Sequence, residues 1–167
     1  MRARYPWFPM KTILAPVDFS GVTKSVVAAA GALAQALNGR VVLVHVVRPP
    51  AVINEYAPEI ERLADLASKS ATQQMALCQK ELRNYRIDVD VVQSFGVPVA
   101  NILEQARRLE ADYIVMGSHG HSALYGLLAG STASGVLKKA GCPVVIVPPG
   151  EKHHAAAIAE AQTRRAG

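Results

Sequence analysis

The chain has 167 residues, of which half are hydrophobic and 5% are aromatic, and its formal net charge is +5. This length can bury one core without disulfide or metal staples, and the apolar runs are too short to cross a membrane. Because no block of Lys and Arg is interleaved with aromatics, and no secretory signal opens the sequence, we predict a cytoplasmic, single-domain protein with no nucleic-acid and no membrane partner.

Apolar runs and helical patterns alternate along the chain. The apolar runs have the length and β-branched content of buried strands, and they cover residues 12–17, 40–47, 87–95, 113–116 and 144–147. The helical patterns between them cover about residues 20–37, 58–83, 98–106 and 131–140. This alternation predicts an α/β fold, in which right-handed crossovers place helices on both faces of a parallel sheet.

Local signals place the ends of these elements. Ser20 is a suitable N-cap for the first helix, and Asn38-Gly39 ends it. The long helix carries one apolar stripe, formed by Ile60, Leu63, Ala67, Ala71, Met75, Cys78 and Leu82. We expect residues 1–9 to be a flexible lead-in, residues 10–149 to form the domain, and residues 150–167 to form a charged, alanine-rich tail.

Three glycines follow the fourth strand and lead into the last helix. They are Gly117, Gly120 and Gly130, and Ser131 and Thr132 come directly after them. Glycine lets the backbone approach an anion closely, and a helix start adds free N–H donors. The stretch therefore predicts a phosphate-binding loop.

A ligand crevice is expected where the strand order of such a sheet reverses. Asp18 directly follows the first strand and Gly117 follows the fourth, so both line one crevice if those strands are neighbours. His45 and Val46, near the end of the second strand, would lie beside it.

Several of these segments together resemble the universal stress protein family. The resemblance rests on Asp18 in APVDFS, the LVHVV strand, Gly96-x-Pro98, and MGSHG followed after nine residues by GSTASGVLKKAGCPVVIVP. It covers about residues 10–148. It implies a doubly wound, Rossmann-like five-stranded parallel sheet of order 3-2-1-4-5, ATP in the crevice, and a homodimer formed through the last strand, Val144, Val145, Ile146 and Val147.

The resemblance also assigns the nucleotide contacts. Adenine would lie against an apolar slot and the phosphates against the glycine loop, with Mg²⁺ or Mn²⁺ held through the phosphates and not by protein side chains. The implied ATP-binding residues are Pro16, Val17, Asp18, Val46, Met116, Gly117, Ser118, His119, Gly120, Gly130, Ser131 and Thr132. No catalytic residue is predicted.

Plainer interpretations compete with several of these assignments. Asp18 also suits an Asx-turn, and His45 suits the end of an apolar strand. His119 and His121 are either cations for phosphate or solvated loop residues. An apolar group within residues 124–128 is either a short helix on the core or a contact surface for a second subunit.

Three functions are compatible with the pattern. The first is an ATP-binding stress-response or regulatory dimer, which leaves a downstream protein partner open. The second is a slow ATPase or phosphotransfer enzyme, although the P-loop lysine motif is missing. The third is an ATP-independent dimeric scaffold, which the unbroken glycine motif disfavours. For the dimer, the alternative is that residues 155–161 cover the edge strand within one monomer.

Overall fold

The computed structural model describes residues 10–47, 57–119 and 130–149. Strands and helices alternate throughout this part of the chain: β1 (Thr12–Pro16), α1 (Thr23–Leu37), β2 (Arg40–Val47), α2 (Ala57–Asn84), β3 (Val89–Phe95), α3 (Pro98–Arg108), β4 (Tyr113–Gly117), α4 (Ser131–Leu137) and β5 (Val144–Val147). The predictions for residues 1–9, 120–129 and 150–167 lie outside the described residues.

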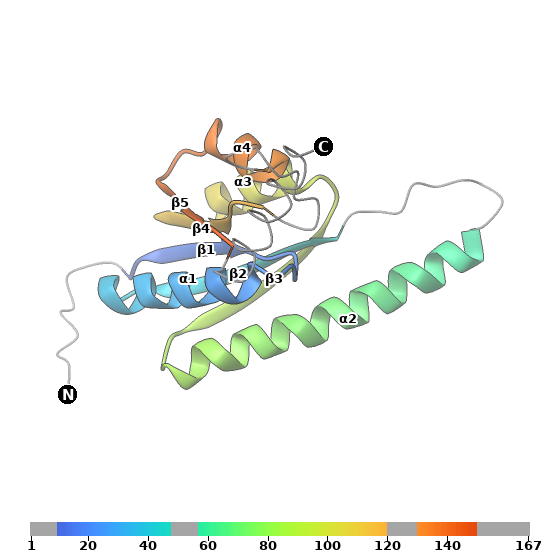
Figure 1. Cartoon of the computed structure of the whole chain (residues 1–167), viewed down its shortest axis with the longest axis horizontal. Coiled ribbons are helices and arrows are strands. Elements are labelled where there is room, and N and C mark those ends of the chain that lie inside the picture. The colour runs from blue at the N-terminus through green and yellow to red at the C-terminus, as the bar shows by residue number, and fades with distance from the viewer. Residues whose placement is uncertain (1–9, 48–56, 120–129, 150–167) are drawn as a thin grey trace, which may run out of the picture.

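The strands form one parallel sheet in the order β3-β2-β1-β4-β5. Figure 1 shows α1 and α2 on one face of this sheet and α3 and α4 on the other. The predicted α/β fold and strand order are therefore confirmed. No helix within the described residues is both long and apolar enough to span a membrane.

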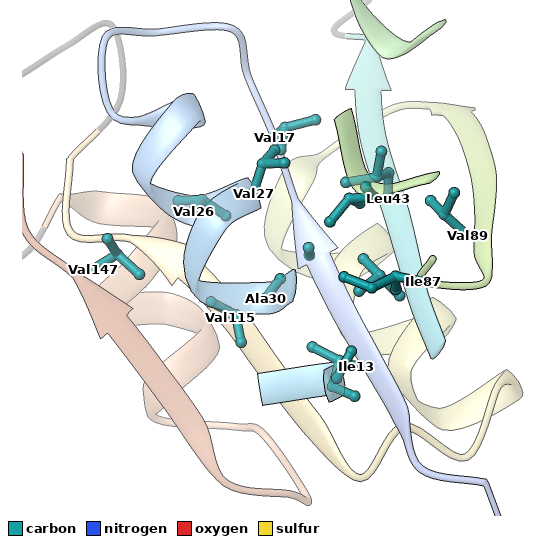
Figure 2. Close-up of a cluster of buried hydrophobic side chains, with 14 of the residues drawn as sticks. Ile13, Val17, Val26, Val27, Ala30, Leu43, Ile87, Val89, Val115 and Val147 are labelled. Carbon is teal, nitrogen blue, oxygen red and sulfur yellow. The ribbon is translucent and has the colours of Figure 1, made fainter. Parts of the chain in front are cut away.

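Small side chains bring α1 close to the sheet. Val26, Val27 and Ala30 on α1 are buried against Ile13 and Val115 in the first core cluster, which Figure 2 shows between the helix and the strands. A Cβ on Gly31 would lie only 3.0 Å from Cδ2 of Leu82. The small residues of α1 thus allow close packing, alanine and valine against the sheet and Gly31 against Leu82 of the neighbouring helix α2.

A second core cluster fills the opposite face of the sheet. Leu14, Val42 and Ile114 pack there beneath Ile102 of α3 and Val136 of α4. A Cβ on Gly135 of α4 would lie 2.8 Å from Cγ2 of Val99 on α3. Gly135 therefore permits the close approach of the two helices.

The two ends of α1 differ in how well the sequence predicted them. Asn38 adopts a left-handed conformation with φ of 52° and ends the helix, as predicted. The prediction of Ser20 as the N-cap is wrong: the helix begins at Thr23, after Val22, without a side-chain cap. The Ser20 hydroxyl instead donates to Oδ1 of Asp18 at 2.6 Å, so it is not available to cap the helix.

The apolar stripe of α2 is buried only in its C-terminal half. Ala71, Met75 and Leu82 are at most 4% exposed, whereas Leu63 is 65% exposed. Figure 1 shows the reason, because the N-terminal half of α2 extends past the sheet. The predicted apolar stripe is therefore only partly a core-facing surface, and Leu63 lies on its exposed part.

Candidate functional site

A cleft opens where the strand order reverses. β1 and β4 are neighbours, but they pair only at Ile13 with Tyr113 and at Leu14 with Ile114. Beyond these positions the residues at the carboxyl ends of β1, β2 and β4 line a cavity of about 550 Å³. Its volume is within the range of small-molecule sites, and its position is the one that doubly wound sheets use for ligands.

The cleft brings the described candidate residues together. Each of them lines it: Pro16, Val17, Asp18, Val46, Met116, Gly117, Ser118, His119, Gly130, Ser131 and Thr132. Gly120, the remaining candidate, lies outside the described residues, as does His121. The fold therefore makes one site of segments that lie about a hundred residues apart in the sequence.

Backbone hydrogen bonds fix the two ends of the glycine loop beside each other. The N–H of Ser118 donates to the carbonyl of Val147 at 2.8 Å, and the N–H of Gly130 donates to the carbonyl of Ser118 at 2.6 Å. The carbonyl of Gly130 then accepts from the N–H of Ser134 at 2.9 Å as α4 begins. The end of β4 and the start of α4 are thus held as one rigid wall of the cleft.

The described residues require glycine at Gly117 but not at Gly130. A Cβ on Gly117 would lie 2.5 Å from Cγ1 of Val22, which is too close for any side chain. Among the described residues, a Cβ on Gly130 would meet nothing nearer than the Ser118 carbonyl oxygen, at 3.4 Å. Gly130 has a φ of −65°, which any residue adopts. Packing therefore explains Gly117, whereas the missing side chain at Gly130 leaves the backbone accessible from the cleft.

Asp18 forms the Asx-turn that the sequence allowed. Its Oδ1 accepts from the N–H of Ser20 at 3.0 Å and from the Ser20 hydroxyl. The next residue, Phe19, has a φ of 61°, a conformation that non-glycine residues rarely adopt. Such backbone strain is frequently found at functional sites.

His45 connects the ends of β2 and β1. Its Nδ1 lies 2.9 Å from the carbonyl oxygen of Val17. Because a carbonyl only accepts, Nδ1 carries the hydrogen and donates it. The Phe19 ring lies against the imidazole with a centroid distance of 4.5 Å. These contacts hold the β1 end in place, and His45 also lines the cleft.

The predicted apolar slot is built from both core clusters. Val17 is 6% exposed and belongs to the first cluster, whereas Met116 is 4% exposed and belongs to the second. Val46, which packs against the second cluster, is half-buried. Whether adenine occupies this slot stays a prediction.

Some lining residues were not predicted from the sequence. They include Val22 and Thr23 at the start of α1, Ala67 of α2, and Pro98 and Ile102 of α3. No signal in the sequence placed Val22 or Thr23 at the cleft, because both fall within the helix expected from about residue 20. Ala67 had no signal beyond its place in an apolar stripe, and α2 lies far along the chain from the motif.

The described lining of the cleft is mostly uncharged. Asp18 supplies its carboxylate, and no Lys or Arg is present among the described lining residues. Within the same part of the chain, no group of three or more His, Cys, Asp or Glu is placed to hold a metal ion. Any anion there would be held mainly by backbone N–H groups, hydroxyls and His119.

Fold and site together define a doubly wound α/β protein with its crevice at the reversal of strand order. The model of the universal stress protein family matches residues 9–148. The chain therefore belongs to the universal stress protein family.

Relatives with known sequences or structures agree with this assignment. A universal stress protein of Thermus aquaticus, encoded in the QAH/OAS sulfhydrylase 3′ region, is 36% identical over 140 residues, which are 82% of this chain and 98% of that protein. UspA from Lactobacillus plantarum has a TM-score of 0.76 at 27% identity and covers 87% of this chain and 99% of its own. A universal stress protein solved in complex with cAMP has a TM-score of 0.56 at 24% identity, covering 82% and 95%.

Proposed function

We propose that this protein binds an adenine nucleotide, and ATP in particular, in the cleft between the ends of β1, β2 and β4. One observation carries the proposal: the β1 end and the described part of the glycine motif line the same cavity of about 550 Å³. The role we propose is that of a stress-response or regulatory nucleotide-binding protein.

Gly130 supports a phosphate site beside Ser131 and Thr132. No described residue comes closer than 3.4 Å to the position of a Cβ at Gly130, so the absence of a side chain is better explained by a ligand that approaches the backbone. Backbone N–H groups and hydroxyls suit phosphate oxygens, which only accept hydrogen bonds. A divalent cation, Mg²⁺ or Mn²⁺, would then be carried by the phosphates themselves.

The apolar slot of Val17, Val46 and Met116 supports a flat, weakly polar ring as the other end of the ligand. Nucleotide sites commonly combine such an apolar wall with a few fixed polar groups. A family member of the same fold was solved with cAMP. Adenine nucleotides are therefore the first ligand class to test.

The nature of the proposed site favours binding over turnover. The described lining of the cleft holds one carboxylate, that of Asp18, and no Lys or Arg to stabilise a phosphoryl group in transfer. Within the described residues no group of three or more His, Cys, Asp or Glu is placed to hold a catalytic metal ion either. We therefore propose little or no intrinsic hydrolysis.

The direct test is to identify the nucleotide that the protein carries and to measure its affinity. The purified protein is denatured and the released small molecules are analysed by mass spectrometry, while calorimetry measures ATP binding to nucleotide-free protein. An adenine nucleotide in the released fraction, together with saturable ATP binding, is expected. A protein that carries no nucleotide and shows no heat with ATP would refute the proposal.

Gly130→Ala is the variant that tests the phosphate site. The added methyl would come no closer than 3.4 Å to any described residue but projects where a phosphate would approach the backbone, so ATP affinity should fall by roughly tenfold or more, as for the loss of one hydrogen bond to a charged group. Gly141→Ala is the matched control, because a Cβ there meets no described residue within 4 Å and Gly141 is not among the residues that line the cleft. Unchanged ATP affinity in a folded Gly130→Ala protein contradicts the assignment.

We further propose that the protein is a homodimer that pairs through β5, and that residues 10–149 are its nucleotide-binding unit. β5 is an edge strand of the sheet, and Val145 on it is 38% exposed. An apolar edge strand without a charged residue favours pairing with another strand, and a second copy supplies a self-complementary one.

A further inference from the structure

Thr23 has a buried hydroxyl that the proposed function leaves unexplained. The described part of the chain contains four buried polar side chains. Three of them have side-chain partners: Thr12 has Arg40, Gln105 has Arg108, and Ser118 has His119. Oγ1 of Thr23 has no hydrogen-bond partner among the described residues. Buried polar groups are nearly always paired, so an exception needs a physical reason.

The position of Thr23 links it to the cleft. Thr23 is the first residue of α1, is 7% exposed, and lines the cavity. Its own N–H already donates to the Ser20 carbonyl at 3.0 Å, so only the hydroxyl is unsatisfied. The preceding residue, Val22, lies against Gly117. Thr23 is therefore placed beside the glycine segment that is proposed to hold phosphate.

We propose that the Thr23 hydroxyl donates a hydrogen bond to a phosphate oxygen of the bound nucleotide. The proposal rests on the proposed function and adds a residue to it. Thr23 lines the cleft while its Oγ1 is buried without a partner among the described residues. Threonine in a helix adopts two χ1 rotamers, and a change of χ1 is the movement by which the hydroxyl would meet the ligand. Because a phosphate oxygen only accepts, the hydroxyl must be the donor.

Thr23→Val separates this role from a purely structural one. Valine keeps the shape and removes the hydroxyl. In the nucleotide-free protein it should be at least as stable to urea as the wild type, because it removes an unpaired buried polar group. At the same time, ATP affinity measured by calorimetry should fall by roughly tenfold, the size expected for a hydrogen bond to a charged group.

Three controls sharpen the measurement. Thr23→Ser keeps the hydroxyl and should retain the wild-type ATP affinity. Ser94→Ala is the matched control. Ser94 as a residue is only half-buried, but its hydroxyl oxygen is buried and has no partner among the described residues. Ser94 is not among the residues that line the cleft, so affinity should not change. Adenosine, which lacks phosphate, should bind Thr23→Val and the wild type equally.

Several results would overturn the inference. Unchanged ATP affinity in Thr23→Val does so, and so does an equal loss for ATP and adenosine, which would place the hydroxyl at the nucleoside. A Thr23→Val protein less stable than the wild type means that the hydroxyl is already satisfied, for instance by water.

Binding of tripolyphosphate distinguishes failure of this inference from failure of the proposed function. A wild-type protein that binds neither ATP nor tripolyphosphate refutes both, whereas Thr23-dependent binding of tripolyphosphate with no preference for ATP refutes only the adenine assignment.

Discussion

Asp112 joins β1 and β4 at the end of the sheet away from the cleft. Its Oδ1 accepts from Nζ of Lys11 at 2.7 Å and its Oδ2 accepts from the N–H of Thr12 at 2.8 Å. The hydrogen bond from Lys11, followed by that from Thr12, holds the pKa of the Asp112 carboxyl below its usual value. The same pair raises the pKa of Lys11.

Asp112→Asn should lower the free energy of unfolding at neutral pH. It should also make that free energy depend less on pH in the acid range. The folded protein keeps Asp112 ionised to a lower pH than the unfolded chain does, so the charge stabilises the fold above the unfolded pKa of about 3.9. That contribution is lost as the pH falls through the lower folded pKa. Urea unfolding as a function of pH should therefore show a gap between wild type and variant that closes below about pH 3.9.

Asp90→Asn is the control for this measurement. Asp90 pairs with Arg40 at 3.0 Å, but its side chain is 64% exposed, and such surface pairs contribute little. A gap for Asp112→Asn that stays constant at every pH, or one no larger than for Asp90→Asn, contradicts the role given to the carboxylate.

At the residue scale, the sequence predicted the cleft where a motif or a strand end marks it. Asp18 and Gly117 were predictable because each lies at or just after the carboxyl end of a strand, and the carboxyl ends of neighbouring parallel strands meet. Thr23 was not, because a hydroxyl near a helix start ordinarily indicates capping. Only three-dimensional burial shows that this hydroxyl has no partner in the described structure.

At the scale of elements, periodicity predicted which face of a helix is apolar but not how much of that face is covered. The stripe of α2 continues with the same spacing from Met75 back to Leu63, yet the exposed fraction rises from 2% to 65%. The helix extends past the sheet. The spacing of apolar residues along a helix does not encode where the sheet beneath it ends. Strand bounds were more predictable, and the second and fifth strands match the structure residue for residue.

Alanine substitutions along α2 should reveal this difference. Met75→Ala removes a buried side chain and should cost about 2–5 kcal/mol. Leu63→Ala should change the free energy of unfolding by no more than about 0.5 kcal/mol, as for an exposed position. Both are measured by urea denaturation at neutral pH. Equal costs at the two positions would mean that the N-terminal half of α2 is covered in solution.

At the scale of the whole molecule, the sheet has two edges with different neighbours. β3 forms one edge beside α2, and β5 forms the other. Val91 on β3 and Val145 on β5 are 39% and 38% exposed. Similar exposure on the two edges makes these valines a matched pair for testing which edge binds a second copy.

Val145→Lys should convert the proposed dimer to a monomer without unfolding it. A charge on β5 opposes pairing of this edge with its symmetry mate, whereas Val91→Lys on β3 should leave the dimer intact. Light scattering gives the mass, and circular dichroism checks that both variants are folded. A wild-type monomer at tens of micromolar or so, or a dimer lost equally in both variants, contradicts pairing through β5.

The limited pairing of β1 with β4 has a dynamic consequence. Asp112 joins the two strands at one end, and paired positions cease after Leu14 and Ile114. At the cleft end, a ligand that touches both strands would link parts of the sheet that share no ladder there. Binding should therefore slow local opening, and hence amide hydrogen exchange, at the cleft end, while exchange near Asp112 stays the same. Ligand binding in the cleft would then change the local rate of backbone opening without changing the fold.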